Sequence, residues 1–159
     1  MAYIDPRWVR AVDLSNASPN SLVTTSDYGK SVWLVSEAPQ PVATVINGEH
    51  LGLGMMIDVA GNWSGYAVEG VSIEVDDGSA FMMTGVSAKT LSIVRERDEL
   101  TLLMNLDNGR GRQERTGVVL ASGLPSCTGS RRVGYSKWRV VKCDGDRVHV
   151  LQEVDANAS

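Results

Sequence analysis

The sequence predicts an all-β fold: a single-domain antiparallel β-sandwich or closed β-barrel, built from serial hairpins, with at most one short N-terminal helical turn. Three observations predict it. Apolar and polar residues alternate with period two along most of the chain, turn-forming Gly, Asp, Asn and Pro interrupt these runs, and no long amphipathic helical pattern is present. Sandwiches and barrels protect the strand edges that such a chain would otherwise expose.

One domain over residues 1–159 is expected, because a chain of this length buries enough apolar surface to fold alone. Within it we expect an irregular N-terminal segment over residues 1–30, a β core over residues 31–154 and a C-terminal tail over residues 155–159. The tail offers almost nothing to bury.

The N-terminal segment carries the helical signal. Asp5 can cap a turn that begins at Pro6, because an Asp side chain accepts from free amides and Pro suits the first helical position. Residues 8–14 also fit a strand. Residues 16–28, rich in Ser, Asn and Thr, are expected to form a loop.

Three hairpins account for most of the remaining strands. In the clearest, residues 137–143 and 147–154 flank Asp144-Gly145-Asp146, a turn that accepts positive φ. Two more are expected to pair residues 71–75 with 80–84 and residues 90–95 with 100–106. Further strands are expected over residues 31–36, 42–46, 55–60 and 117–121, and a second long loop over residues 124–134.

The formal net charge of -4 conceals an asymmetry. Residues 1–87 carry three basic and ten acidic side chains, whereas residues 88–159 carry twelve basic and nine acidic ones. Such a division can place an acidic and a basic surface on one fold, which favours contacts between copies or with an acidic partner. The alternative is that both sets are dispersed, solvated charges.

The first ten residues lack the apolar core of a secretory signal, and no apolar run approaches the roughly 20 residues of a membrane span. We therefore expect a soluble cytoplasmic protein, with a virion as an alternative location and no membrane partner. In a reducing cytoplasm, Cys127 and Cys143 are expected to be small buried or half-buried residues. They could form a disulfide if the protein leaves the cell.

Familiar catalytic and metal-binding motifs are missing from the sequence. Gly29-Lys30-Ser31 resembles the end of a phosphate-binding loop, but Thr24 stands where that loop needs a glycine. Only two histidines are present, His50 and His149, so a metal site would need scattered ligands. No Gly-x-Ser-x-Gly elbow occurs. We expect no metal and no cofactor.

If the protein is an enzyme, the candidate acid and base groups are His50, Asp58, Tyr66 and Glu69, which lie near Trp63 in the sequence. A carboxylate or histidine that aromatic side chains shield from water can act as an acid or base on a bound substrate. This hypothesis implies a cofactor-independent isomerase or cyclase.

A second hypothesis concerns a hydrophobic ligand. Methionines form an unusual share of the apolar residues in a chain with one phenylalanine, and flexible thioethers suit an adaptable cavity. The residues that would line it are Met55, Trp63, Tyr66, Met82 and Met104. The simpler interpretation is that the methionines fill the core.

Gly61-Asn62-Trp63 is similar to the Gly-x-Trp of lipocalin-like ligand-binding barrels. The resemblance implies that Trp63 closes one end of a barrel, with Arg139 as a conceivable partner. In that family the motif lies on the first strand, whereas here it falls more than a third of the way along the chain. This placement favours a turn followed by a Trp that anchors the core.

Basic residues concentrate around residues 108–115. Glycines between Arg110, Arg112 and Arg115 would let the guanidinium groups follow an anionic surface, and we assign the same role to Arg131 and Arg132. The overall negative charge and the lack of nearby aromatic residues disfavour nucleic acid. The alternative is a charged hairpin tip that favours solubility.

Together these observations favour a non-enzymatic binding or assembly protein that associates with itself or a protein partner through acidic and basic surfaces, for example in a viral or phage particle. The alternative is a small barrel that binds a hydrophobic molecule in a Met- and Trp-lined interior. As an enzyme, it would cyclise or isomerise that molecule.

Overall fold

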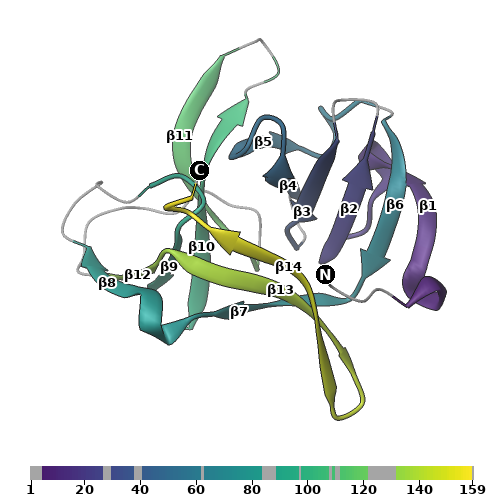
Figure 1. The fold of residues 1–159 in the computed structure, drawn as a ribbon. Helices are drawn as coiled ribbons and strands as arrows, with labels where there is room; N and C mark the ends of the chain where they lie inside the picture. Colours follow the sequence, from purple (N-terminus) through teal and green to yellow (C-terminus); the bar gives the residue numbers. More distant parts are fainter. Residues whose placement is uncertain are drawn as a thin grey trace.

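The computed structural model describes residues 5–26, 30–37, 41–61, 63–83, 89–96, 98–107, 109, 112–121 and 132–158. These residues form strands and three short 3-10 turns (Figure 1). The strands are β1 (Val9–Asp13), β2 (Ser21–Thr25), β3 (Ser31–Val35), β4 (Val42–Gly48), β5 (Leu53–Met56), β6 (Ser64–Glu69), β7 (Val71–Val75), β8 (Ala80–Met83), β9 (Ile93–Glu96), β10 (Glu99–Asp107), β11 (Gln113–Val119), β12 (Arg132–Tyr135), β13 (Lys137–Asp144) and β14 (Arg147–Asp155). The turns are η1 (Pro6–Trp8), η2 (Leu14–Asn16) and η3 (Asp77–Ser79).

The larger sheet runs β1-β6-β2-β3-β4-β5-β10-β9-β12-β8, with β11 on the other edge of β10. Strand β10 is nine residues long, and its first half pairs with β9 while its last three residues pair in parallel with β5. The same edge of β10 therefore pairs first with β9 and then with β5. This arrangement joins two hydrogen-bonded sets of strands into one sheet.

The smaller sheet has the order β14-β13-β7 and is antiparallel throughout. Its connection to the larger sheet is short, because a single residue, Gly70, separates β6 from β7. The smaller sheet crosses in front of the larger one in Figure 1. The two sheets are therefore packed layers of one fold.

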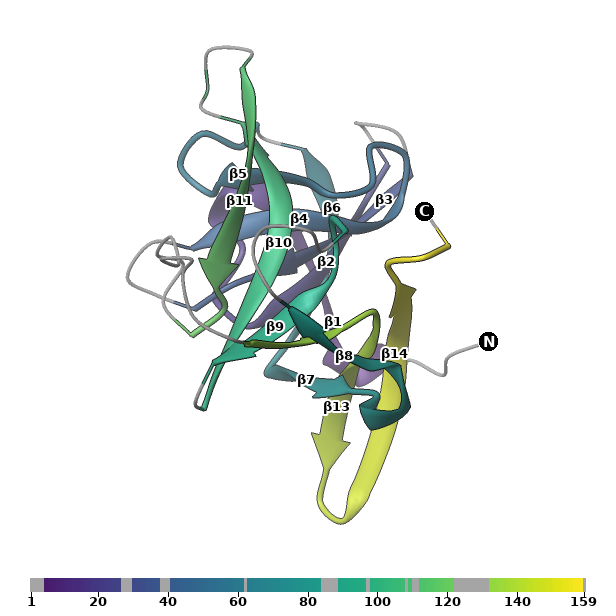
Figure 2. The same ribbon diagram turned by 90° about the vertical axis from the view of Figure 1, so that its left-hand side faces the viewer.

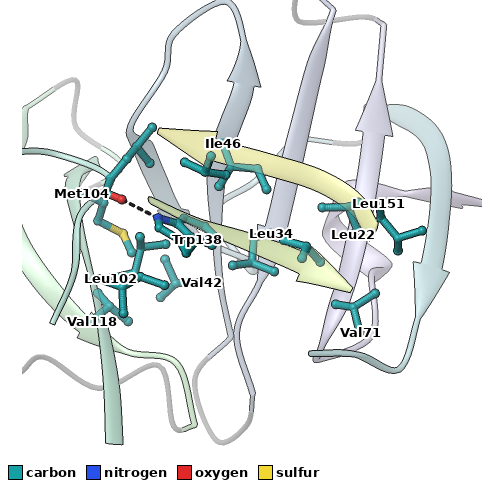
Figure 3. Close-up of a cluster of buried hydrophobic side chains, with 14 of the residues drawn as sticks. Leu22, Leu34, Val42, Ile46, Val71, Leu102, Met104, Val118, Trp138 and Leu151 are labelled. Carbon is teal, nitrogen blue, oxygen red and sulfur yellow. Dashed lines mark hydrogen bonds between the residues drawn. The ribbon is translucent and has the colours of Figure 1, made fainter. Parts of the chain in front are cut away.

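The main hydrophobic core lies between the two sheets (Figure 3). Trp138 of β13 projects into it and is 2% exposed. Its indole N–H donates to the backbone carbonyl oxygen of Leu91 at 2.7 Å, and the Leu91 N–H donates to the Leu103 carbonyl oxygen at 2.8 Å. Trp138 thereby links the smaller sheet to the turn that precedes β9 and, through Leu103, to β10.

A second core covers the other face of the strands around β3. Its centre is Trp33, which is fully buried, donates its indole N–H to the Thr25 hydroxyl at 3.0 Å and stacks on Trp63 at 5.9 Å. Leu14 of η2 is also fully buried there. The central strands are thus buried on both faces, as their apolar composition requires.

The all-β prediction is confirmed: apart from the three 3-10 turns, the described regular structure is all strand, in two antiparallel-rich sheets. The arrangement is sandwich-like, and the described strands do not close into a barrel. The expected cap is present, because Asp5 accepts from the Arg7 N–H at 2.9 Å. Hydrogen bonds from the Arg7 guanidinium, and secondly from that N–H, lower the Asp5 pKa below its usual range. In the described part of the chain, no helix is long and apolar enough to span a membrane.

The expectation of an irregular segment over residues 1–30 is wrong, since β1 and β2 lie within it. Strand β2 occupies residues 21–25 of the predicted loop and lies between β6 and β3. Its Ser and Thr residues favour a loop in the sequence, but the two buried hydroxyls, those of Ser21 and Thr25, both have hydrogen-bond partners. For example, Ser21 is fully buried and donates to the Ser18 carbonyl oxygen at 2.6 Å.

The predicted pairing of residues 71–75 with 80–84 is also wrong. The Asp76 carboxylate accepts from the Gly78 N–H and caps η3, which redirects the chain. As a result β7 pairs with β13, and β8 pairs with β12 in the other sheet. The other two hairpins are confirmed as β9–β10 and β13–β14.

Three smaller expectations change. Cys143 is an exposed free thiol, not a buried one, and Cys127 lies outside the described residues. Ala156, in the predicted tail, is fully buried and donates its N–H to the Ser136 carbonyl oxygen at 2.7 Å. The predicted loop over residues 124–134 overlaps β12, which begins at Arg132.

We predict that Trp138→Phe lowers the free energy of unfolding by about 2–4 kcal/mol. The Leu91 carbonyl would lose its buried donor, and the smaller ring would leave a cavity. Urea denaturation measures the change. Val148→Ala, at a side chain that is 49% exposed, is the control and should cost under about 0.5 kcal/mol. Equal stability of the Trp138 variant and the wild type would contradict the assigned role.

We also predict that Gly48→Ala is more destabilising than Gly145→Ala. Both glycines have positive φ, so both variants lose about 1 kcal/mol from backbone strain. Only at Gly48 would the added Cβ meet a backbone atom, the Lys30 carbonyl oxygen, at 2.0 Å, which should cost roughly 1–3 kcal/mol more. Denaturation midpoints of the two variants test the difference, and equal midpoints would refute it.

Candidate functional site

A hollow lies at the end of the smaller sheet where β7 ends, β13 begins and β14 ends. Its volume is about 720 Å³, within the usual range for ligand sites of roughly 300–1,000 Å³. We call it the charged groove; it is lined by Glu74, Val75, Asp76, Asp77, Lys137, Trp138, Arg139, Glu153, Val154 and Asp155.

Strand register arranges the charges of the groove in rows. Arg139 on β13 lies opposite Glu74 on β7 and Glu153 on β14. In the next row of the same face, Lys137 lies opposite Asp155. Because side chains alternate along a strand, residues 137 and 139 share the face that points away from the core. Each cation thus has carboxylates on the neighbouring strands.

The base of the groove is fixed by the core beneath it. Trp138, Val75 and Val154 occupy the row between the two charged rows, and their side chains belong to the main core. Burial of these apolar groups holds the three strands together. The backbone that carries the charged side chains is therefore well positioned.

A hydrogen-bond network around Ser79 holds the outer wall. The Ser79 hydroxyl accepts from the Lys137 N–H at 3.0 Å and donates to the Asp76 carbonyl oxygen at 2.7 Å. The Asp76 N–H donates to the Lys137 carbonyl oxygen at 3.0 Å. These bonds tie η3 to the start of β13.

The groove is acidic overall. Its five carboxylates exceed its two cations, which gives a formal charge of -3. The Arg139 guanidinium and the Glu74 carboxylate form an ion pair at 2.7 Å, but both side chains are about 40–45% exposed, so the pair adds little stability. An excess of carboxylates can attract a cationic group. Arginine is well suited to such a site, because its guanidinium group can donate two parallel hydrogen bonds to one carboxylate.

The four candidate acid–base residues do not meet. His50 lies in the turn after β4 and Asp58 follows β5, whereas Tyr66 and Glu69 lie on β6. Strands β2 and β3 lie between β6 and β4, so three strand spacings of about 4.8 Å each separate the two pairs. Glu69 forms an ion pair with Arg10 at 2.5 Å.

The five candidate ligand-lining residues are likewise dispersed. Met55 belongs to the second core and Met104 to the main core, where its sulfur accepts from the Thr44 hydroxyl at 3.4 Å. Trp63 packs on the second core, while Tyr66 and Met82 are 64% and 66% exposed. These methionines therefore do not line one common cavity.

The lipocalin-like expectation for Trp63 also changes. Its ring stacks on Trp33, and Arg139, its conceivable partner, instead bonds Glu74 in the smaller sheet. Trp63 anchors the second core, as the alternative interpretation proposed.

The predicted basic residues are only partly described. Arg112 and Arg115 are exposed, with Arg115 near the start of β11. Arg110 and Arg131 lie outside the described residues, and only the backbone of Arg132, in β12, is described.

Sequence reasoning missed the charged groove. Asp76 and Asp77 were assigned to a hairpin turn, and Glu153 and Asp155 to the end of a strand and the tail. The available signal was the repeated placement of acidic residues at strand ends, in Glu74 to Asp77 and again in Glu153 to Asp155. In the part of the chain that the structure describes, no three His, Cys, Asp or Glu side chains gather closely enough to hold a metal ion.

Comparison with known proteins gives a family. The family model described as "Uncharacterised protein y4lG" matches residues 11–159, which includes every strand of the charged groove. No curated protein and no solved structure matches the chain. On the extent of the family match, the chain belongs to the family of the uncharacterised protein y4lG.

Proposed function

We propose that this protein is a non-enzymatic assembly protein that binds other copies of itself through complementary charged surfaces. The observation that carries the proposal is the charged groove, with its formal charge of -3, on a chain that also exposes Arg112 and Arg115 on a separate hairpin. Complementary charges on separate parts of one chain favour ordered contacts between copies.

The chemistry of the groove supports binding. Its ionisable groups are carboxylates, one lysine and one arginine, arranged in rows in which cations alternate with anions. Such a surface recognises a partner by charge and shape. The four residues that the sequence suggested for acid–base chemistry, His50, Asp58, Tyr66 and Glu69, are not among the residues that line it.

The acidic surface differs from the one that the charge asymmetry suggested. Glu74, Asp76 and Asp77 come from the acidic first half of the chain, but Glu153 and Asp155 come from the basic second half. Sequence halves are therefore not spatial halves. The proposal requires an acidic site on the folded chain, and the groove meets that requirement.

Repetition of such a contact would suit a subunit of a larger particle. A contact between two different patches of the same chain extends from copy to copy unless symmetry closes it. Assembly of this kind needs no bound cofactor.

We predict that the protein is multimeric at low ionic strength and dissociates toward its monomer mass of 17.1 kDa at high ionic strength. Raising the salt from about 0.01 M to about 1 M shortens the Debye length from about 30 Å to about 3 Å and weakens exposed charge contacts. Gel filtration with light scattering measures the mass. A mass of 17.1 kDa at every salt concentration would refute the proposed function.

A further inference from the structure

We infer that strand β1 forms an antiparallel pair with β1 of a second copy of this chain, across a two-fold axis at Ala11. The inference rests on the proposed function, because it assumes that copies associate, and it deepens that function by naming a backbone contact beside the charged one. The larger sheet ends at β1, which pairs only with β6 among the described strands. In Figure 1, β1 lies at the right-hand margin of the fold, beyond β6.

The backbone groups of β1 alternate in direction. In an antiparallel pair, a residue that bonds the neighbouring strand is followed by one whose N–H and C=O groups point away from that strand. The Leu14 N–H donates to the Trp63 carbonyl oxygen at 2.9 Å, which continues the pairing of β1 with β6. By alternation, Val12 and Arg10 also bond β6. The residues whose backbone groups point outward are Val9, Ala11 and Asp13.

Two short turns flank β1 and use some of these outward groups. The Val9 N–H donates to the Pro6 carbonyl oxygen at the end of η1. Asp13 is the N-cap of η2, so its carbonyl oxygen accepts the first hydrogen bond of that turn. Within the described ranges, the outward groups that remain without a partner are the Val9 C=O, the N–H and C=O of Ala11, and the Asp13 N–H.

The remaining groups complement those of a second copy across a two-fold axis. When two β1 strands run antiparallel with Ala11 opposite Ala11, each Ala11 N–H meets the Ala11 C=O of the other copy. Each Asp13 N–H then meets the Val9 C=O of the other copy. The Val9 N–H and the Asp13 C=O, which this register would pair next, are the groups that η1 and η2 already hold. The two turns therefore limit the contact at both ends and fix its register.

The side chains of β1 permit the same register. Ala11 is small and exposed, and it lies opposite Tyr66 of β6, which is 64% exposed. Across the axis, two alanines lie side by side between two tyrosines, whose rings can cover them. On the other face, Arg10 lies opposite Val12 of the second copy. No like charges are therefore placed opposite each other.

The other sheet edges are less suited to such a pair. Figure 2 shows β14 at the outer edge of the smaller sheet, beside β13. The register of β14 shifts between its partners Val140 and Val141, and such bulges protect an edge from pairing. At the opposite edge, the Val71 N–H of β7 donates to the Asn20 carbonyl oxygen. Strands β8 and β11 lie close in the chain to residues outside the described ranges, so we assign no partner to their edges.

The β1 contact is small and adds to the charged one. Its few hydrogen bonds replace bonds to water, so they strengthen an association that other contacts also hold. No residue of β1 lines the charged groove, so one copy can use both surfaces at once. The two-fold β1 pair gives dimers, and charged contacts link these dimers into larger assemblies.

Hydrogen exchange at single amides tests the pairing in the wild type. We expect the Ala11 amide to exchange at least about tenfold more slowly in the multimer at low salt than in the dissociated protein at high salt, because only the multimer supplies its acceptor. The Arg10 and Val12 amides are internal controls. They bond β6 within the chain and should be protected at both salt concentrations.

A proline substitution tests the same contact. Ala11→Pro removes the outward N–H and leaves the bonds to β6 in place, and proline is tolerated on a sheet edge where the N–H faces solvent. We expect the protein concentration at which half of the low-salt multimer dissociates to rise about tenfold or more. Ala11→Val keeps the N–H and is the matched control. Light scattering over a dilution series measures association, and thermal melting shows whether each variant is folded.

The outcomes separate the inference from the proposed function. If the wild type associates but its Ala11 amide exchanges equally fast at low and high salt, the inference fails and the proposed function stands. Equal association of Ala11→Pro and Ala11→Val has the same meaning. If Ala11→Pro does not fold, the exchange measurement on the wild type decides alone. A wild type that is monomeric at every salt concentration overturns both.

Discussion

The joining of the two sheets depends on the hydrogen bond from the Trp138 indole to the Leu91 carbonyl. Leu91 is buried and has a φ of 72°, a conformation that a leucine adopts only when its surroundings hold it. The Leu91 N–H donates to the Leu103 carbonyl oxygen of β10, and the Leu91 carbonyl oxygen accepts from the Trp138 indole of β13. Lys137 and Arg139 are the neighbours of Trp138 in β13, and their side chains lie on the opposite face of the strand. Trp138 therefore holds in place both the core and the backbone that carries the groove charges.

The sequence predicts strands whose partners are neighbours in the chain. The pairs β9–β10 and β13–β14 follow from alternation and short turns, and the structure confirms them. The sequence predicts poorly which strands pair when they are distant in the chain. Both β7 and β8 are expected as strands, but the turn η3 between them places them in different sheets. Strand β2 is hard to predict because three of its five residues, Ser21, Thr24 and Thr25, are polar. It lies inside a sheet, where backbone pairing and the hydrogen bonds of the buried Ser21 and Thr25 hydroxyls satisfy these groups.

The same limit applies to the site. The arginine run around residues 110–115 is visible in the sequence because it is local. The groove is not, because β13 brings Glu74 and Glu153 together from two strands far apart in the chain. Counting charges by halves of the sequence could not find a surface to which both halves contribute. The register of the three strands places Lys137 and Arg139 beside carboxylates.

The buried methionines are divided between the two cores. Met55 and Met104 fill different cores on the two faces of one sheet, and Met104 lies so close to Gly54 that a Cβ there would meet its sulfur at 2.3 Å. Side chains packed this closely hold the fold. The charged rows lie outside these cores. Groove charges can therefore change without loss of the packing that holds the sheets, so the proposed assembly can be tested by substitutions that leave the fold intact.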